Sequence, residues 1–215
     1  MSDRKKIRVL LADDHAVVRA GYRVLLQNTD DIEVVAEADS GERACRAFAD
    51  LQPDVVVMDL TMPGIGGLEA IRRMVARDPN ARILVFSMHE DTVFVEQSLQ
   101  AGAQGYITKS SAPEILVEAI RELASGKSHI DTEIVQRLAF QKARGKDSPF
   151  MNLSTREFEI FCLLAEGLNT SEIAKRLSLS YKTIANYSTQ IKSKLHVSTV
   201  AEIARLAIRH NIINA

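Results

Sequence analysis

The sequence predicts an α/β fold with a doubly wound, five-stranded parallel sheet, followed by an all-α domain of four helices. Short apolar segments alternate with amphipathic helical segments five times within residues 8–124. The segment 55–58 is a continuous apolar run, which is typical of a strand buried on both faces in the middle of a parallel sheet. Beyond residue 150 the apolar residues recur only at helical spacing. Together these observations predict two domains of different class, joined by residues 125–149.

Each predicted strand is followed by a predicted helix, which is the pattern of right-handed crossover units. The strands are expected at residues 7–12, 32–36, 55–58, 82–86 and 105–107. The helices that follow them are expected at residues 17–26, 40–51, 68–75, 93–99 and 114–124. Pro113 precedes the last helix, and proline is tolerated in the first turn of a helix. All five strands should therefore run parallel, with helices on both faces of the sheet.

The composition is that of a globular protein with hydrophobic cores of its own. Of 215 residues, 46% are hydrophobic and 26% are charged, and the length allows one or two domains. No apolar run approaches the roughly 20 residues that span a bilayer, and acidic residues follow too soon after the N-terminus for a signal peptide. We therefore expect a cytoplasmic protein that does not contact membranes. Cys45 and Cys162 lie in helical patterns without metal-ligand spacing, so we expect two buried free thiols.

Polar side chains follow several predicted strands at the point where each strand ends. Asp13 and Asp14 follow the first strand, Asp59 the third, Ser87 the fourth and Lys109 the fifth. A single aspartate after a strand is more often a helix cap or a turn residue. Five polar positions at one edge of a parallel sheet, where open α/β sheets bind their ligands, have a chemical interpretation instead.

Three carboxylates close together repel one another and require a counter-ion. Mg²⁺, a hard cation with oxygen ligands, fits such a group. The cation and Lys109 would together neutralise an incoming phosphoryl group, while Asp59 attacks the phosphorus atom as a carboxylate nucleophile. This edge of the sheet therefore predicts phosphoryl transfer to Asp59.

The same residues resemble the receiver domain of two-component response regulators. The shared motifs are DD after the first strand, D-x-x-M-P-G-x-x-G after the third, Ser or Thr after the fourth and Lys after the fifth. The resemblance covers residues 8–124. It implies that Asp59 is the phospho-acceptor and that Asp14, Asp59 and the main-chain carbonyl of Thr61 bind Mg²⁺, with Asp13 acting through water.

The resemblance also assigns roles to residues beyond the carboxylates. Ser87 would hydrogen-bond one phosphoryl oxygen, and Lys109 would pair with another. Tyr106 occupies the position of the family's rotameric switch, although a core tyrosine on a strand would fit the same pattern. The phosphoryl group would come from a sensor histidine kinase or from a small phosphodonor.

Residues 125–149 are predicted to connect the two domains. Helix-forming residues predict a linker helix at 131–143. A flexible, mostly basic segment is expected at 141–148, with a hinge near 144–149.

The C-terminal domain, residues 150–215, is the more basic part of the chain. From residue 148 onward there are 8 Lys and Arg against 5 Asp and Glu, whereas the preceding residues have 19 against 23. A polyanion would therefore be bound by this domain. Four helices are expected, the first with the capping-box spacing of Ser154 and Glu157, at residues 154–166, 170–177, 180–195 and 199–210.

On the third of these helices the apolar residues share one face, so the opposite face is polar and free of acidic residues. Such a face suits the major groove of DNA, where amides read adenine and lysine meets guanine or phosphate. The alternative is an ordinary solvated face. The candidate DNA-binding residues are Lys182, Thr183, Ala185, Asn186, Thr189, Gln190, Lys192 and Lys194.

The pattern LSTREFEIFCLLAEGLNTSEIAKRLSLSYKTIANYSTQIKSKL resembles the LuxR-type DNA-binding domain. The resemblance covers residues 150–213, and the pair of domains is similar to the NarL/FixJ class of response regulators. The closing LAIRHNII and Tyr187 resemble its GacA/UvrY branch. Ala185, Thr189 and Val200 depart from the basic residues common in the family, so the charge of the third helix would come from Lys182, Lys192 and Lys194.

The two resemblances imply a transcription factor, not an enzyme, that a histidine kinase phosphorylates on Asp59. Phosphorylation would produce a homodimer that binds DNA. Before it, the receiver would pack against the C-terminal domain and cover part of the helix Lys182–Lys194. Two alternatives stay open. Haloacid-dehalogenase-like phosphatases use similar residues, but Thr61 stands where they have a second aspartate as general acid. A silent receiver that serves only in interactions would not need all five polar positions.

Overall fold

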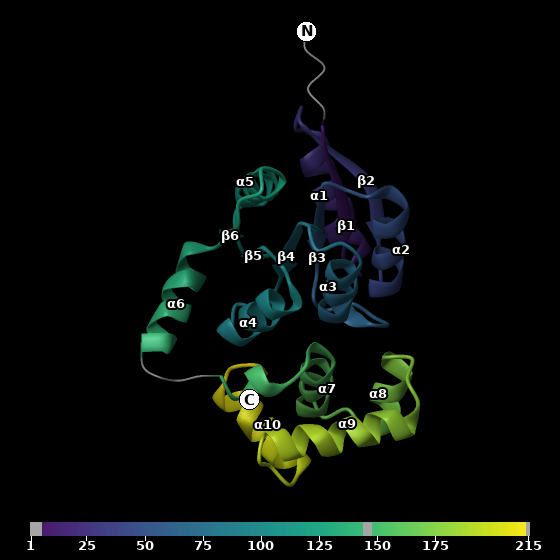
Figure 1. Ribbon diagram of the computed structural model, residues 1–215, viewed down its shortest axis with the longest axis vertical. Helices are drawn as coiled ribbons and strands as arrows, with labels where there is room; N and C mark the ends of the chain where they lie inside the picture. Colours follow the sequence, from purple (N-terminus) through teal and green to yellow (C-terminus); the bar gives the residue numbers. More distant parts are fainter. Residues whose placement is uncertain (1–5, 144–147, 214–215) are drawn as a thin grey trace.

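A six-stranded parallel sheet and a separate group of helices make up the chain (Figure 1). The structure is a computed structural model, and it describes residues 6–143 and 148–213. The expected hinge near 144–149 falls largely on residues 144–147, which lie outside the described residues. None of the described helices is long and apolar enough to cross a bilayer.

The sheet has the strand order β2-β1-β3-β4-β5-β6, and every neighbouring pair is parallel. The strands are β1 (Ile7–Ala12), β2 (Ile32–Ala38), β3 (Val55–Met58), β4 (Ile83–Ser87), β5 (Gly105–Thr108) and β6 (His129–Ile130). The prediction of five strands is therefore wrong by one, because β6 lies in the expected linker. A two-residue strand is too short to show a hydrophobic period.

Helices cover both faces of the sheet, and each face has its own hydrophobic core. These helices are α1 (Ala16–Gln27), α2 (Gly41–Leu51), α3 (Gly66–Arg77), α4 (Thr92–Ala101) and α5 (Pro113–Ala124). Residues of α1 and α5 pack in the core that contains Val55, whereas residues of α2, α3 and α4 pack in the core that contains Val56. Successive residues of a strand point to opposite faces. The apolar run of β3 is therefore buried on both sides, as predicted.

Four α-helices form the C-terminal part, as predicted, and a side chain caps each of them. The helices are α7 (Thr155–Ala165), α8 (Thr170–Arg176), α9 (Tyr181–Lys194) and α10 (Val200–Arg209). Each N-cap side chain accepts a hydrogen bond from a backbone N–H of the first turn, which offsets one of the donors left unpaired there. These caps are Ser154, Asn169, Ser180 and Thr199. The linker helix α6 (Thr132–Ala143) lies to one side, and the 3₁₀-helix η1 (Pro149–Asn152) leads into α7 (Figure 1).

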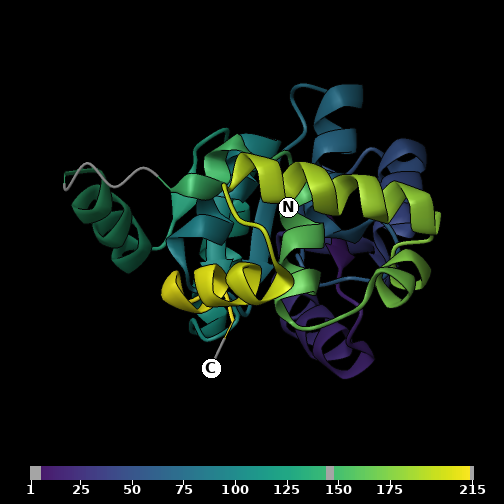
Figure 2. The same cartoon turned by 90° about the horizontal axis from the view of Figure 1, so that it is seen from below.

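The C-terminal part packs against the sheet domain through α7. Phe94 of α4 meets Phe158 of α7 edge to face, with 5.3 Å between the ring centroids, and both side chains are buried. Nε2 of Gln97 donates a hydrogen bond to the carbonyl oxygen of Phe150 at 2.9 Å. Figures 1 and 2 together place α7 against the sheet domain and α9 on the far side of it.

The sheet domain approaches one face of the helix Lys182–Lys194, which agrees with the expectation that it covers part of this helix, but the polar face stays open. Lys182 and Asn186 are exposed, and α9 runs across the front of Figure 2, away from the sheet. Only the other face of α9 approaches the sheet domain, where Tyr187 lines a groove with Arg72. Burial of the apolar surface of α7 is favourable. Burial of the polar face of α9 would cost free energy, because its polar groups would lose their hydrogen bonds to water.

Both cysteines are free thiols, as predicted, but each is half-buried rather than fully buried. Cys45 lies on α2, with its Sγ atom 3.8 Å from the carbonyl oxygen of Ala70. Cys162 lies on α7 at the boundary between the two parts of the chain. Burial raises the pKa of both thiols, so the reactive thiolate is a minor form of each.

Candidate functional site

The carboxyl ends of β1, β3 and β5 bring two aspartates and a lysine into one buried pocket. Asp13 and Asp59 have only 2% and 3% of their surface exposed. They follow adjacent strands, so the two carboxylates lie side by side. Nζ of Lys109 lies 2.7 Å from Oδ2 of each carboxylate. The ammonium therefore compensates two negative charges that have lost most of their water.

Burial and the shared ammonium have opposite effects on ionisation in this pocket. Burial raises the pKa of Asp59, because lost solvation disfavours the carboxylate, and the hydrogen bond from Lys109 offsets this only in part. Burial also disfavours the charged form of Lys109, but the hydrogen bonds to Asp13 and Asp59 outweigh it and raise its pKa. Lys109 therefore stays protonated at neutral pH and makes the pair of buried carboxylates tolerable.

Asp14 and Thr61 extend the pocket towards solvent. Asp14 is exposed, and its Oδ1 atom lies 2.9 Å from Nδ1 of His15. The backbone N–H of Thr61 donates to Oδ1 of Asp59 at 3.3 Å, which holds the loop after β3 against the carboxylate. One ligand atom from each of Asp13, Asp14, His15 and Asp59 lies within 4.8 Å of the others. His15 is not among the predicted residues, although its position directly after the DD pair is the signal that could have found it.

Ser87 and Tyr106 are both fully buried behind the acidic pocket. The hydroxyl of Tyr106 donates a hydrogen bond to the carbonyl oxygen of His89 at 2.7 Å. Oγ of Ser87 accepts a longer hydrogen bond, 3.3 Å, from the backbone N–H of His89. Burial raises the pKa of Tyr106, so its phenol remains protonated. Tyr106 is thus a core residue that connects β5 to the loop after β4, and its role as a switch stays a prediction.

The loop after Asp59 requires glycine where it passes closest to that aspartate. A Cβ atom on Gly67 would lie 2.1 Å from the carbonyl oxygen of Asp59, far inside van der Waals contact. Gly64 has φ +80°, a left-handed conformation that residues with a side chain rarely adopt. These glycines of the motif therefore serve the backbone, and they allow α3 to start immediately beside the acidic pocket.

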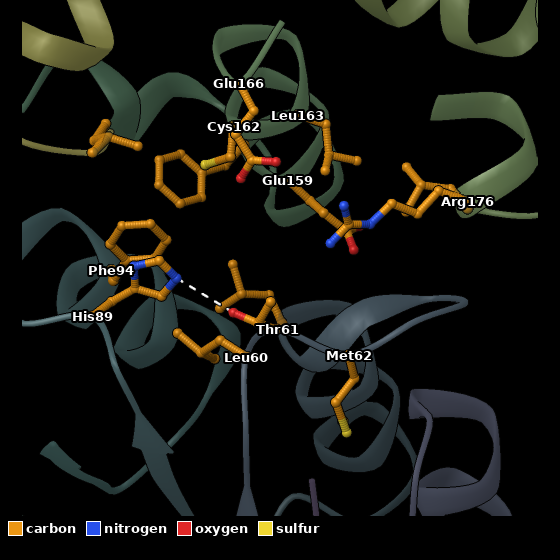
Figure 3. Close-up of a pocket in the computed structure, with 14 residues that line it drawn as sticks. Leu60, Thr61, Met62, His89, Phe94, Glu159, Cys162, Leu163, Glu166 and Arg176 are labelled. Carbon is orange, nitrogen blue, oxygen red and sulfur yellow. Dashed lines mark hydrogen bonds between the residues drawn. The ribbon is translucent and has the colours of Figure 1, made fainter. Parts of the chain in front are cut away.

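A cavity of about 80 Å³ lies between this loop and the C-terminal helices (Figure 3). Thr61 and His89 line it on one side, and Glu159, Cys162 and Arg176 line it on the other. Figure 3 shows these side chains facing one another across the boundary between the two domains. The cavity is large enough for a few water molecules, so the contact between the domains is incompletely packed here.

His89 connects the acidic pocket to the domain contact. Its Nε2 atom lies 3.4 Å from Oγ1 of Thr61, and its ring stacks on Phe94 at 3.8 Å between centroids. Phe94 in turn contacts Phe158 of α7. Burial lowers the pKa of His89 to about 4, with a smaller contribution from the charge of Lys109, so the imidazole is neutral at pH 7.

Arg156 of α7 fastens the C-terminal domain to the loop after β3. One guanidinium nitrogen, Nη1, donates to the carbonyl oxygen of Ile65 at 3.2 Å and also pairs with Glu159. The carboxylate of Glu159 lies against Gly66, where a Cβ atom would be 2.0 Å from Oε1. Burial raises the pKa of Glu159 to about 7, and the charge of Arg156 opposes that rise.

The predicted DNA-reading face of α9 is only partly free. Lys182, Asn186, Thr189 and Gln190 are exposed, whereas Thr183, Ala185 and Lys192 are half-buried. Two hydroxyls are already engaged within the helix: Oγ1 of Thr183 lies 2.7 Å from Oγ of Ser180, and Oγ1 of Thr189 donates to the carbonyl oxygen of Ala185 at 3.1 Å. Recognition of bases would therefore fall mainly to the amides of Asn186 and Gln190.

Lys194 has a partner inside the domain. Its Nζ atom lies 2.6 Å from Oε2 of Glu157, a buried carboxylate that also closes the capping box of α7. Burial opposes the charged form of Glu157, but the hydrogen bonds from Lys194 and Ser154 outweigh it and lower its pKa. A contact between Lys194 and a DNA phosphate would have to compete with this ion pair.

Two family models match the chain. The model described as "Response regulator receiver domain" matches residues 9–121, and the model described as "Bacterial regulatory proteins, luxR family" matches residues 151–207. The first match alone covers more than half of the chain. The chain is a response regulator. Its receiver domain holds the acidic pocket, and its LuxR-type DNA-binding domain holds α9.

Full-length relatives agree with this assignment. Response regulator UvrY of Escherichia coli O157:H7 is 42% identical to this response regulator over 214 residues, covering 97% of each chain. Response regulator GacA of Pseudomonas aeruginosa is 39% identical over 211 residues, covering 97% of this chain and 99% of the relative. This response regulator therefore belongs to the NarL/FixJ class, and the prediction of that class is confirmed.

A solved structure of similar architecture contains a bound promoter. RcsB from Salmonella enterica serovar Typhimurium, bound to a promoter in the presence of the phosphomimetic BeF₃⁻, has a TM-score of 0.70 at 29% identity. The match covers 94% of this response regulator and 98% of that chain. The homologues are DNA-binding transcription regulators rather than enzymes, which removes the phosphatase alternative.

Proposed function

We propose that a sensor histidine kinase, or a small phosphodonor, phosphorylates this response regulator on Asp59, and that this controls dimerisation and DNA binding. The observation that supports the acceptor most strongly is the ammonium of Lys109, 2.7 Å from both Asp13 and Asp59. A cation in that place can neutralise charge on a phosphoryl group as it arrives. The domains would be the receiver at 8–124, the linker at 125–149 and the DNA-binding domain at 150–215.

In the proposed transfer, a carboxylate oxygen of Asp59 attacks the phosphorus atom of a phosphohistidine. The new O–P bond forms as the N–P bond breaks, and the imidazole of the kinase keeps the electron pair and takes a proton from water. Lys109 would then turn from Oδ2 of Asp59 to a phosphoryl oxygen while keeping Asp13. Ser87, whose Oγ accepts a 3.3 Å hydrogen bond from the backbone N–H of His89, is the hydroxyl that would donate to a second oxygen.

The donors at the pocket fit Mg²⁺, which prefers oxygen ligands and keeps several waters. Asp14 and Asp59 would bind it together with the main-chain carbonyl of Thr61, and Asp13 would act through water. When bound, the cation supplies positive charge that offsets the repulsion between the carboxylates and an incoming phosphoryl group.

Phosphorylation would reach the DNA-binding domain through the loop after β4. If the Ser87 side chain rotates to donate to the phosphoryl group, its oxygen moves relative to the backbone N–H of His89, from which it accepts a 3.3 Å hydrogen bond. The ring of His89 stacks on Phe94, which packs against Phe158 of α7. Movement of this loop, with Tyr106 changing rotamer as the predicted switch, would therefore weaken the contact that holds α7.

A released DNA-binding domain would bind as a dimer. Its net charge is only +3 from residue 148 onward, so one copy makes few phosphate contacts. Two copies joined through their receivers convert the second half-site contact into an intramolecular step. RcsB dimers bound to two parallel DNAs are among the similar structures, at 28% identity and a TM-score of 0.60. With DNA as the proposed partner and a kinase as the proposed phosphodonor, we infer a cytoplasmic location.

The test is phosphorylation with acetyl phosphate and Mg²⁺, followed by gel separation of phosphorylated and unmodified protein. The wild type should gain one acid-labile phosphoryl group, and Asp59→Asn should gain none. Asp50→Asn, which removes an exposed carboxylate of α2, should be labelled like the wild type. Equal labelling of the wild type and the Asp59→Asn variant would exclude Asp59 as the acceptor.

A further inference from the structure

His15 occupies the N-cap position of α1 but does not cap the helix. Its side chain makes no capping hydrogen bond, although Ser, Thr, Asp and Asn are preferred at such positions because their side chains do so. The imidazole is turned towards the carboxylates instead, with Nδ1 2.9 Å from Oδ1 of Asp14 and 3.4 Å from Oδ1 of Asp13. The backbone N–H of His15 donates to the same oxygen of Asp13 at 2.8 Å, which fixes the residue beside the pocket.

The spacing of these atoms is within about 1 Å of that of one metal coordination sphere. Nitrogen and oxygen ligands lie about 2.0 to 2.2 Å from a small divalent cation, so neighbouring octahedral ligands are about 2.9 to 3.1 Å apart and opposite ligands about 4.2 Å. The 2.9 Å between His15 and Asp14 corresponds to a neighbouring pair. The largest separation within the cluster, 4.8 Å, exceeds the opposite-ligand distance by less than 1 Å.

Lys109 binds only one oxygen of each buried carboxylate, so other atoms of the pocket are available to a cation. It takes Oδ2 of Asp13 and Oδ2 of Asp59. Oδ1 of Asp59 has only a 3.3 Å hydrogen bond from the backbone N–H of Thr61. That oxygen, the exposed carboxylate of Asp14 and Nδ1 of His15 are therefore ligand atoms that Lys109 does not occupy.

A nitrogen donor changes which cation the pocket prefers. An all-oxygen set suits Mg²⁺, whereas imidazole favours transition-metal ions, with affinity that rises from Mn²⁺ through Co²⁺. We infer that His15 is a ligand at this site and that the pocket binds a transition-metal divalent cation, such as Mn²⁺ or Co²⁺, more tightly than Mg²⁺ because of it. This inference rests on the proposed cation site of the receiver and adds the imidazole to it. An ion pair between His15 and Asp14 alone would not select among divalent cations.

Metal titration without a phosphodonor tests the inference on the full-length protein, with any histidine tag removed. The electron paramagnetic resonance signal of free Mn²⁺ measures Mn²⁺ binding, and competition with Mg²⁺ and Co²⁺ gives the other two affinities. His15→Ala and His15→Gln should each lower the Co²⁺ to Mg²⁺ affinity ratio about tenfold or more. His196→Ala, which removes an exposed imidazole of the DNA-binding domain, should leave the ratio unchanged.

Coordination by the ring gives a second readout. Pulsed electron paramagnetic resonance of bound Mn²⁺ should show coupling to imidazole nitrogen in the wild type and none in either His15 variant. An unchanged affinity ratio in both variants, or no nitrogen coupling in the wild type, overturns the inference. Neither result bears on the acceptor, because labelling of Asp59→Asn is measured separately with Mg²⁺.

Discussion

The acidic pocket of the receiver and the exposed face of α9 hold their polar groups in opposite ways. In the pocket, Asp13 and Asp59 are almost fully buried and Lys109 fixes both. On α9, Lys182 and Asn186 are exposed to water. The pocket is thus organised before its ligand arrives, whereas the helix face gains its interactions only when DNA binds. A substitution should therefore disturb folding and function together in the pocket, but only binding on the helix face.

The largest effect is expected for Lys109→Ala. Its loss leaves two buried carboxylates uncompensated, and the free energy of unfolding should fall by about 2 to 3 kcal/mol, below the value for a fully enclosed pair because the pocket is open at Asp14. The pKa of Asp59 is raised in the folded protein. A carboxyl group whose pKa is raised in the folded state stabilises the fold at pH values below its unfolded-state pKa. That stabilisation is lost as the pH rises through the folded-state pKa.

The cost of Lys109→Ala should therefore be larger at pH 7.5 than at pH 4.5, and urea unfolding at both values measures it. Adding Asp59→Asn to this variant should restore much of the stability, since one buried charge is removed. Lys127→Ala, an exposed lysine, is the matched control. A pH-independent cost would mean that Lys109 contributes packing rather than charge.

On the helix face, Asn186→Ala should weaken binding to the specific operator by about 1 to 3 kcal/mol and change binding to random DNA little, because a bidentate amide contact discriminates bases. Lys182→Ala should weaken both and reduce the salt slope by about one. Titrations of each variant against both duplexes at several salt concentrations separate the two patterns. Neither substitution should shift the unfolding midpoint, and a shift in either would break the contrast with the pocket.

Lys194→Ala tests a residue that is exposed like the helix face but paired with a buried carboxylate like the lysine of the pocket. Removing its ion pair with the buried Glu157 should lower the stability of the DNA-binding domain by about 1 kcal/mol, discounted because the lysine is partly exposed. The pKa of Glu157 is lowered in the folded state, so the stabilisation is present above its unfolded pKa and is lost as pH falls. The difference from the wild type should accordingly shrink towards pH 3 in thermal unfolding. A changed salt slope with unchanged stability would make Lys194 a phosphate contact instead.

The smallest effect concerns coupling between the two regions. Gln97→Ala removes the buried hydrogen bond to the carbonyl oxygen of Phe150, which should weaken the domain contact by about 0.5 to 1 kcal/mol. Small-angle scattering of the unphosphorylated protein should then show a larger share of extended molecules, and DNA binding without phosphodonor should increase. Gln100→Ala, an exposed glutamine on the same helix, should change neither. Extended molecules without stronger DNA binding would mean that the contact does not inhibit the DNA-binding domain.

The fold could be predicted from the sequence where a local rule determines it. The apolar run of β3 and the cap residues Ser154 and Ser180 act within a few positions, so strands and helices emerge with small errors at their ends. The sixth strand could not be predicted, because β6 exists only through its pairing with β5. The start of α3 at Gly66, two residues early, follows from the close approach of Gly67 to Asp59 rather than from periodicity.

The site divides in the same way. The DD pair, Asp59 and Lys109 are found from the sequence because parallel topology brings strand ends together. The partner of Lys194 is 37 residues away, and no spacing rule relates it to Glu157. His89 and Arg156 were likewise beyond prediction, since each acquires its role only from the way α7 packs on the receiver. Tertiary contacts between domains are therefore the part that sequence patterns do not encode locally.

Alkylation of Cys162 can report how often the two domains separate. Its thiol lines the cavity beside α7, and burial keeps its pKa raised while the domains are together. In a Cys45→Ser background only one thiol remains. Alkylation of that thiol would then proceed at a rate set by how often the two domains separate, because the thiolate forms more readily in water. The rate at which the half-buried Cys162 is alkylated would therefore measure the lifetime of the closed state.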